Sequence, residues 1–194
     1  AGGLLRAASV PIAKQDLTKV IKFLKRRLES VNVEIKYNTE VTKELLENEY
    51  KGYEVVLSAG SKPVFLEKFA NFKQTLIADD VLMGRSFPGR KIVILGGGSV
   101  GCELADYLAP MVHDLAPRNR EVIIIEAMPA VMMKDAGAGR SALVKRMMSK
   151  GIQMITNATL LETTNDTIKY SVNGEEYTID KLGSELDGQI RAMD

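Results

Sequence analysis

The segment from Lys91 to Leu108 constrains the fold more than any other part of the chain, because three signals follow one another in it. Lys91–Leu95 is a short run rich in β-branched apolar residues, which is typical of a strand buried on both faces. Glycines then stand at the G-x-G-x-x-G spacing between Gly96 and Gly101, and a helical pattern runs from Ser99 to Leu108. A strand, a glycine turn and a helix in this order predict an α/β fold with a Rossmann-like parallel sheet.

The glycine turn predicts a site for the pyrophosphate of a dinucleotide. Gly96 permits a tight turn, Gly98 lets the backbone approach a pyrophosphate, and Gly101 lets the helix pack onto the strand. The first turn of the helix offers free N–H groups and the positive end of the helix dipole. The candidate cofactor-binding residues of the turn are Gly96, Gly97, Gly98, Ser99, Val100 and Gly101. The alternative is a glycine turn with a purely structural role.

A second buried strand, Glu121–Ile125, ends beside an acidic residue, Glu126. In a βαβ dinucleotide fold a carboxylate at this place accepts hydrogen bonds from the adenosine ribose and repels a 2′-phosphate, which predicts NAD rather than NADP. Glu126 follows Gly101 by 25 residues, whereas the usual gap is about 20. We attribute the difference to a lengthened loop over Pro110–Arg120. The alternative is a strand-end glutamate that only faces water.

Composition excludes several other classes of protein. With 194 residues, of which 45% are apolar and 26% charged, the chain has room for one large or two small globular domains. A net charge of +1 gives no electrostatic reason to expect nucleic acid or a membrane surface as a partner. One cysteine and one histidine are too few for a zinc or iron–sulfur site within the chain. The single cysteine is consistent with a cytoplasmic location.

Two further groups of elements are expected on either side of the Rossmann-like unit. Before it, Asp16 to about Ser30 predicts an amphipathic helix with a basic outer face, and Val31–Tyr37 and Tyr53–Ser58 read as strands. After it, Gly139–Lys150 predicts a helix that stops at Gly151, and Ile152–Thr156 a third strand of the unit.

The rest of the chain predicts an antiparallel β-hairpin crossover and two less regular regions. Thr159–Thr164 and Thr167–Val172 alternate as antiparallel strands, and Asn173-Gly174 predicts a type I′ turn into Glu175–Ile179. We interpret the methionine-rich stretch Met128–Met133 as adaptable core filling, and we expect Lys181–Asp194 to be poorly ordered.

We expect two domains. Residues 71–194 form the NAD(H)-binding domain, residues 1–70 form a partial FAD-type domain, and Val64–Pro88 has the character of a connector. Ala1-Gly2-Gly3 reads as the interior of a longer polypeptide rather than as a start.

Taken together, these motifs resemble the pyridine-nucleotide flavoprotein oxidoreductases. More narrowly, they look like the C-terminal half of the group of NADH oxidase, 2,4-dienoyl-CoA reductase and trimethylamine dehydrogenase. The resemblance rests on Gly2-Gly3-Leu4 with Val10-Pro11 and Lys14, on Tyr53–Pro63, on Lys91–Ala105, and on Glu126 with Lys134–Gly137. In that group a flavin-containing barrel precedes an FAD/NAD(P) module.

The resemblance implies roles for residues outside the turn. Glu103 matches an acidic position that in relatives lies near the nicotinamide, although a carboxylate that only stabilises the helix dipole fits it equally well. Gly60 belongs to a segment that is similar to the family's turn between the FAD and NAD domains, with Ala59 where Thr is usual. Gly2 and Gly3 resemble glycines that approach FAD.

Several of the family's features are missing from this chain. They are the leading glycine motif of the FAD domain, the late Gly-Asp motif, and a final strand ending in an Ala-x-Gly turn, whose place is taken by Lys181–Asp194. Cys102 has no partner for a redox pair, and we expect it to be a small buried helix residue. His113, in the loop between Pro110 and Pro117, is expected at the surface.

The resemblance implies that this chain is the NADH-binding portion of a flavoprotein oxidoreductase, which passes a hydride from NADH to FAD. Electrons would go on to an enoate or enoyl-CoA type of acceptor. FAD and the rest of the parent flavoenzyme are expected partners, and we expect the isolated chain to be inactive. The alternatives are a module that binds NAD(H) without catalysis, and an FAD-type interpretation of Gly96–Gly101, which is disfavoured because that motif usually opens the chain.

Overall fold

Five parallel strands form the central sheet of the computed structural model, which describes residues 2–63, 75–109, 120–135, 137, 139–164, 167–180 and 188–191. The strand order is β1-β8-β2-β3-β4. These strands are β1 (Thr75–Ile77), β2 (Lys91–Leu95), β3 (Glu121–Ile125), β4 (Gln153–Ile155) and β8 (Gly188–Arg191). β2 and β3 have the predicted bounds and pair with each other along their whole length. The predicted Rossmann-like sheet is confirmed.

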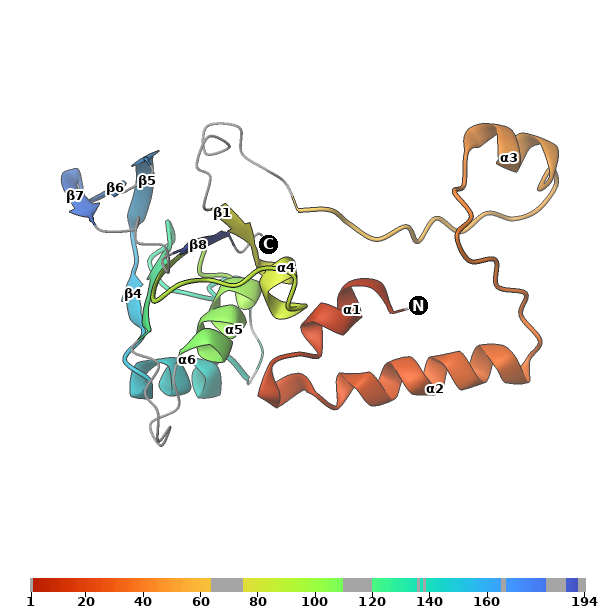
Figure 1. Ribbon diagram of the computed structural model, residues 1–194, viewed down its shortest axis with the longest axis horizontal. Helices are drawn as coiled ribbons and strands as arrows, with labels where there is room; N and C mark the ends of the chain where they lie inside the picture. Colours follow the sequence, from red (N-terminus) through yellow and green to blue (C-terminus); the bar gives the residue numbers. More distant parts are fainter. Residues whose placement is uncertain are drawn as a thin grey trace.

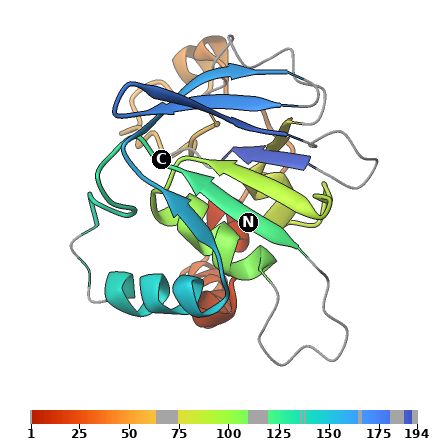
Figure 2. The same cartoon turned by 90° about the vertical axis from the view of Figure 1, so that its left-hand side faces the viewer.

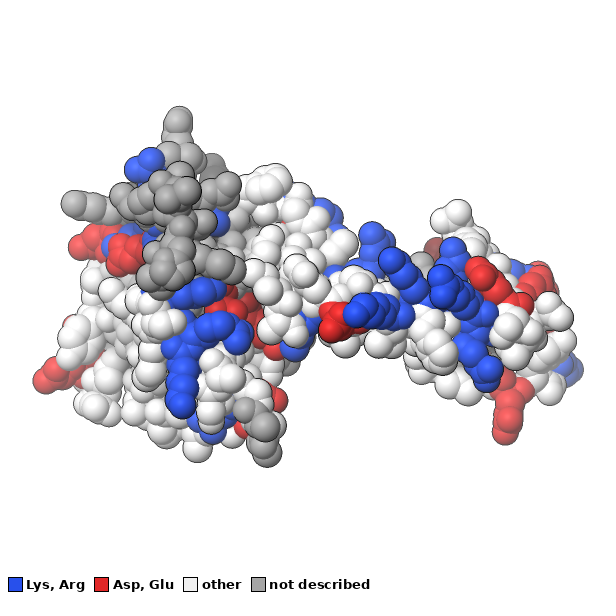
Figure 3. Space-filling model, turned by 90° about the horizontal axis from the view of Figure 1, so that it is seen from below, with Lys and Arg blue, Asp and Glu red and all other residues white. Residues whose placement is uncertain are grey.

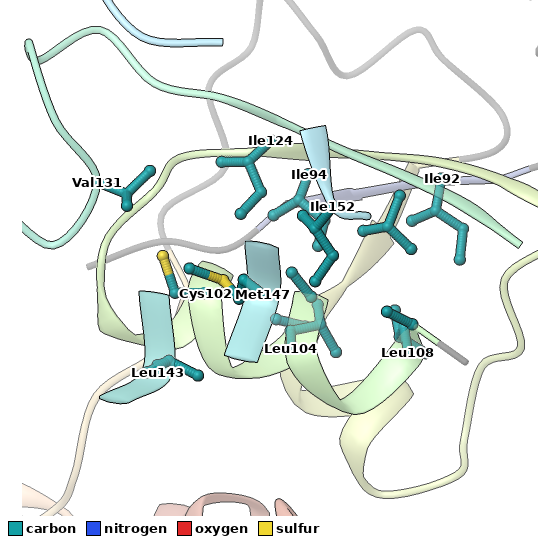
Figure 4. Close-up of a cluster of buried hydrophobic side chains, with 14 of the residues drawn as sticks. Ile92, Ile94, Cys102, Leu104, Leu108, Ile124, Val131, Leu143, Met147 and Ile152 are labelled. Carbon is teal, nitrogen blue, oxygen red and sulfur yellow. The ribbon is translucent and has the colours of Figure 1, made fainter. Parts of the chain in front are cut away.

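Alternate side chains of β2 and β3 face two different layers. On one face, Ile94 and Ile124 are fully buried together with Leu104 of α5 (Ser99–Leu108) and Met147 of α6 (Gly139–Ser149), in a group of buried side chains that we call the helix-side cluster (Figure 4). On the other face, Val93 packs in a second cluster beneath a separate antiparallel sheet. Because both faces are covered, the strands read in the sequence as continuous apolar runs.

The second layer is a three-stranded antiparallel sheet, which lies across the parallel sheet from α5 and α6 (Figure 2). Its strands are β5 (Ala158–Thr163), β6 (Ile168–Val172) and β7 (Glu175–Ile179). Asn173 and Gly174 join β6 to β7 with φ angles of 52° and 88°, as a type I′ turn requires. The sequence therefore predicts this crossover correctly.

The expectation for the C-terminal segment is wrong for Gly188–Arg191. These residues form β8, which pairs with β1 on one side and with β2 on the other. Four residues with little apolar pattern become a strand because two neighbouring strands satisfy their backbone groups. The other residues of the expected poorly ordered segment, 181–187 and 192–194, lie outside the described residues.

The interpretation of Val64–Pro88 as a connector needs a similar correction. Its described part contains β1 and then α4 (Ala78–Leu82), whose Ala78, Val81 and Leu82 are buried in the helix-side cluster. The proposed domain boundary near residue 71 lies outside the described residues, so it stays a prediction.

Residues 2–63, which we call the arm, extend away from the sheets (Figure 1). The arm contains α1 (Gly3–Ala8), a 3-10 helix η1 (Ile12–Lys14), α2 (Leu17–Ser30) and α3 (Lys43–Asn48). Its amino-terminal part reaches the core, where Ala7 of α1 is buried and Val10 packs against the same cluster. Lys and Arg side chains gather along α2 (Figure 3), as its basic outer face predicts.

The strands expected at Val31–Tyr37 and Tyr53–Ser58 do not form in the described chain. Their side chains stay in contact with solvent, and Val56 and Leu57 are 88% and 87% exposed. An extended segment becomes a strand only when another strand pairs with it, and neither segment lies at the edge of a described sheet. Among the described residues, no helix is long and apolar enough to cross a membrane.

Candidate functional site

The glycine turn between β2 and α5 is tied to the end of β3. Gly96 has a φ of +107°, and its N–H donates a hydrogen bond of 2.9 Å to the Ile125 carbonyl. A residue with a side chain is strained at this φ, so glycine is required there. Gly98 then caps α5 with an extended backbone, and α5 begins at Ser99.

Gly97 lies directly against Glu126. Its N–H donates a hydrogen bond of 2.6 Å to Glu126 Oε2. A Cβ atom on Gly97 would lie 2.9 Å from Val131 Cγ1 and 3.0 Å from Glu126 Cβ, so no side chain fits. The motif assigns roles to Gly96 and Gly98 but not to Gly97, so it does not predict this packing. The run of three consecutive glycines was the only signal in the sequence that Gly97 has a role of its own.

Glu126 is held in place by two backbone groups. Besides Gly97, the Met128 N–H donates to its Oε1 over 2.6 Å. The carboxylate is partly buried at the carboxyl end of β3. The structure therefore differs from a glutamate that only faces water, because both carboxylate oxygens have protein partners.

The turn and Glu126 line one cavity of about 230 Å³. Its walls contain Gly97, Gly98, Ser99 and Glu126 from the predicted set. They also contain residues of the segment 127–135, which follows β3 and which we call the methionine loop. Its contributions to the walls are Met128, Ala130, Met132, Met133, Lys134 and Asp135.

The methionine loop does more than fill the core. Met132 is buried in the helix-side cluster, as expected, and its N–H donates to the Gly97 carbonyl over 2.7 Å. Met128 and Met133, by contrast, are 41% and 49% exposed at the cavity. The sequence prediction of core filling is thus correct for Met132 and wrong for the other two.

Val100 and Gly101 lie in the first turn of α5 but contribute differently. Val100 is half-buried and its side chain packs against the helix-side cluster. Gly101 is buried where the helix meets the sheet. Cys102, as predicted, is a fully buried helix residue, and its thiol donates to the Gly97 carbonyl over 3.3 Å.

Glu103 does not line this cavity. Its carboxylate forms an ion pair with Lys14 of η1, and its side chain is 17% exposed. The pair therefore joins α5 to the arm, two parts of the chain that are far apart in sequence. His113 lies outside the described residues.

Gly60 lies at a second cavity, of about 410 Å³, between the arm and α4. Gly3, Arg6, Ala59, Asp79 and Arg85 are among the residues that line it. The predicted site residues are thus divided among the glycine-turn cavity, the Lys14–Glu103 pair and this cavity. No group of acidic, His and Cys side chains suited to a metal ion occurs in the described part of the chain.

Asp106 lies outside the predicted site, at the junction of α5 and α6. Arg146 Nη2 lies 2.9 Å from its Oδ2, and Lys150 Nζ lies 3.0 Å from its Oδ1. Burial acts to raise the pKa of Asp106, but the hydrogen bonds from Arg146 and Lys150 outweigh it and hold the pKa below its ordinary value. This cluster fixes the helix that carries the glycine turn against its neighbour.

Several known proteins are similar to this chain in sequence or in fold. Cinnamate reductase of Clostridium sporogenes is 30% identical over 181 residues, which are 92% of this chain and 26% of that protein. Bilirubin reductase of Mediterraneibacter gnavus is 24% identical over 170 residues, 87% of this chain and 25% of that protein. The chain therefore spans about a quarter of the length of these relatives.

A solved structure of 2-naphthoyl-CoA reductase has a similar fold, with a TM-score of 0.82 at 22% identity. The match covers 99% of this chain and 27% of that one, so it includes the arm as well as the sheets. The family model of the pyridine nucleotide-disulphide oxidoreductases matches residues 7–188. The chain therefore belongs to the pyridine nucleotide-disulphide oxidoreductase family.

Proposed function

We propose that this chain is the NADH-binding portion of a flavoprotein oxidoreductase, in which a hydride passes from NADH to FAD. The observation that carries the proposal is the cavity where the glycine turn and the Glu126 carboxylate meet. Of the groups in the family, we favour that of NADH oxidase, 2,4-dienoyl-CoA reductase and trimethylamine dehydrogenase, on the motifs described above.

In this proposal the turn holds the pyrophosphate of NADH. Backbone N–H groups of Gly98, Ser99 and Val100 lie at the amino end of α5, where the helix dipole favours an anion. Gly96 takes the left-handed backbone conformation of the turn, and Gly97 packs against Val131 and Glu126, where an added Cβ would clash.

Glu126 binds the adenosine ribose. Each carboxylate oxygen has two lone pairs, and the Gly97 and Met128 N–H groups each use one of them. The remaining lone pairs are free to accept from ribose hydroxyls. The same negative charge would repel a 2′-phosphate, which supports NADH over NADPH.

Glu103 and Lys14 lie near the nicotinamide, at the meeting of the NAD-binding part and the flavin. The ion pair supports this placement because it joins α5 to the arm, the part of the chain assigned to the FAD-type domain. NADH supplies the hydride when it is bound and FAD receives it; the residues of this chain bind and orient. Gly60, Arg6 and Arg85, at the second cavity, face the flavin side.

The remainder of a parent flavoenzyme completes the site. The arm exposes Phe23, Tyr53 and Leu57 to extents of 60%, 71% and 87%, an apolar surface that indicates an interface. The names of cinnamate reductase and 2-naphthoyl-CoA reductase support an enoate or acyl-CoA type of final acceptor. A single, buried cysteine suits a reducing compartment such as the cytoplasm.

A non-catalytic NAD(H)-binding module is the second candidate. The exposed arm favours it for the isolated chain, because apolar side chains such as Phe23 and Leu57 are left in contact with solvent. Absorbance of the purified chain tests this candidate for the chain by itself: a colourless protein that binds NADH but does not oxidise it is a binding module in isolation, whatever the parent enzyme does.

Calorimetric titration of the chain with NADH, NADPH and FAD tests the proposal. We expect NADH to bind more tightly than NADPH, and Glu126→Ala to weaken NADH binding at least about tenfold. Glu121→Gln, at the opposite end of β3, is the matched control and should leave the affinity unchanged. Binding of FAD but not of NADH would overturn the assignment and make the glycine turn a flavin site.

A further inference from the structure

The last residue of the methionine loop, Asp135, lies beside the glycine turn. Asp135 and Ser99 are 36 residues apart in sequence, yet the Ser99 hydroxyl donates a hydrogen bond to Asp135 Oδ2. Both residues line the same cavity as Gly97 and Gly98. The carboxylate therefore lies at the amino end of α5, beside the backbone assigned above to a pyrophosphate.

The loop is fixed in this position by several contacts. Val131 packs against the turn, and Met132 donates to the Gly97 carbonyl. Met132 has a φ of +52°, which reverses the chain, and the Asp135 N–H then donates to the Met132 carbonyl over 3.1 Å. A φ in this region is unusual for a residue other than glycine. These contacts therefore hold the loop in one defined conformation beside the glycine turn.

An anion in this place has a predictable electrostatic effect. The amino end of a helix stabilises one nearby negative charge, and here Asp135 supplies that charge from within the protein. A phosphate entering the cavity meets a like charge, which raises its free energy of binding. Lys134 also lines the cavity, but it is exposed, so water screens its attraction.

We propose that Asp135 is a specificity-determining residue that competes with the ligand's phosphates for the amino end of α5. The proposal rests on the proposed function of this cavity. The two carboxylates then act on different parts of the ligand: Glu126 strengthens binding of the adenosine half, whereas Asp135 weakens binding of the phosphate groups. The site thus holds a dinucleotide loosely enough to release it, and it disfavours ligands with additional phosphate groups.

The test compares adenosine with ADP, which share one half and differ in phosphate. Dissociation constants of both are measured by NMR titration of the wild-type chain and of Asp135→Asn, and the ratio of the two constants gives the contribution of the phosphates. Glu121→Gln removes the same charge at the other end of β3, where Glu121 is 49% exposed, and is the matched control. Asp135→Ser is a second variant that removes the charge with a smaller side chain.

We expect Asp135→Asn to tighten ADP binding about three- to tenfold and to leave adenosine binding unchanged, while the control changes neither. An unchanged or weaker ADP affinity with adenosine still bound would overturn the competition and leave the nucleotide site intact. Failure of wild type and variants alike to bind either ligand would overturn the proposed function and the inference together. Failure of both Asp135 variants to fold would make the contact structural and would also overturn the inference.

Discussion

Ile94 in the central sheet and Leu57 in the arm belong to apolar runs of similar length, yet they end in opposite environments. Ile94 is fully buried between β2 and the helices, whereas Leu57 is 87% exposed. The difference lies in the partners of each run, not in the residues themselves. β2 has β3 and β8 on its two sides, while 53–58 has no strand beside it in the described chain. An apolar run in the sequence predicts that a segment can be buried, but the segment is buried only where another strand or helix packs against it.

The largest effect should come from removing apolar volume in the sheet. We expect Ile94→Ala to lower the free energy of unfolding by about 2–5 kcal/mol, because it leaves a cavity in a close-packed core. Leu57→Ala, which removes similar apolar volume in the arm, should change it by less than about 0.5 kcal/mol. Urea unfolding followed by circular dichroism measures both. Equal losses would mean that the arm is as well packed as the sheet.

The glycine turn gives the next largest effect. Gly97→Ala places a Cβ atom 2.9 Å from Val131 Cγ1 and 3.0 Å from Glu126 Cβ, so β3 or the methionine loop must move. We expect a loss of about 1–3 kcal/mol in unfolding free energy, together with weaker NADH binding. Gly137→Ala is the control, since nothing lies within 4 Å of its added Cβ, and it should stay within about 0.5 kcal/mol. A Gly97 variant as stable as the control would contradict the packing described here.

The pH dependence of stability at Asp106 gives a third comparison between the sheet region and the arm. Its pKa is lowered in the folded chain, so its stabilisation is present above its ordinary pKa and is lost as pH falls through the folded value. We expect Asp106→Asn to cost about 1–3 kcal/mol at pH 7, and the wild type to lose this advantage below about pH 4. Urea unfolding between pH 3 and 7 measures it.

Glu44 in the arm is the control for this pH dependence. Its pKa is also lowered, by its own backbone N–H and by the Thr42 hydroxyl, but the residue is fully exposed. Glu44→Gln should therefore leave the pH dependence of stability unchanged. An acid-labile contribution from Glu44 as large as that from Asp106 would show that burial does not distinguish the two regions.

The Rossmann-like unit was predictable because its signals are local. A pattern of about a dozen residues or fewer, made of apolar runs and glycines, is enough to predict each of β2, the turn, α5 and β3. Glu126 also follows from its place at a strand end. In the folded chain a hydrogen bond from the Gly97 N–H to Glu126 joins these two signals.

Other features depend on contacts between distant segments, which no local pattern encodes. β8 is a strand because β1 and β2 leave a place between them, and the expected arm strands fail for lack of such a place. The Lys14–Glu103 pair and the Ser99–Asp135 hydrogen bond join residues whose proximity appears only in the folded chain. Asp106 with Arg146 and Lys150 was missed for the same reason, although Arg146 of α6 and Lys150, the residue directly after α6, stand four residues apart, a spacing that places side chains on one side of a helix.

The most direct test of the central claim is an NMR titration of the isotopically labelled chain with NADH, followed through assigned backbone amides. The account predicts that the signals of Gly97, Gly98, Ser99 and Met128 shift together and saturate, while amides of the antiparallel sheet β5–β7 stay in place. Shifts confined to the second cavity, at Gly3 and Gly60, with no change at the glycine turn, would contradict it.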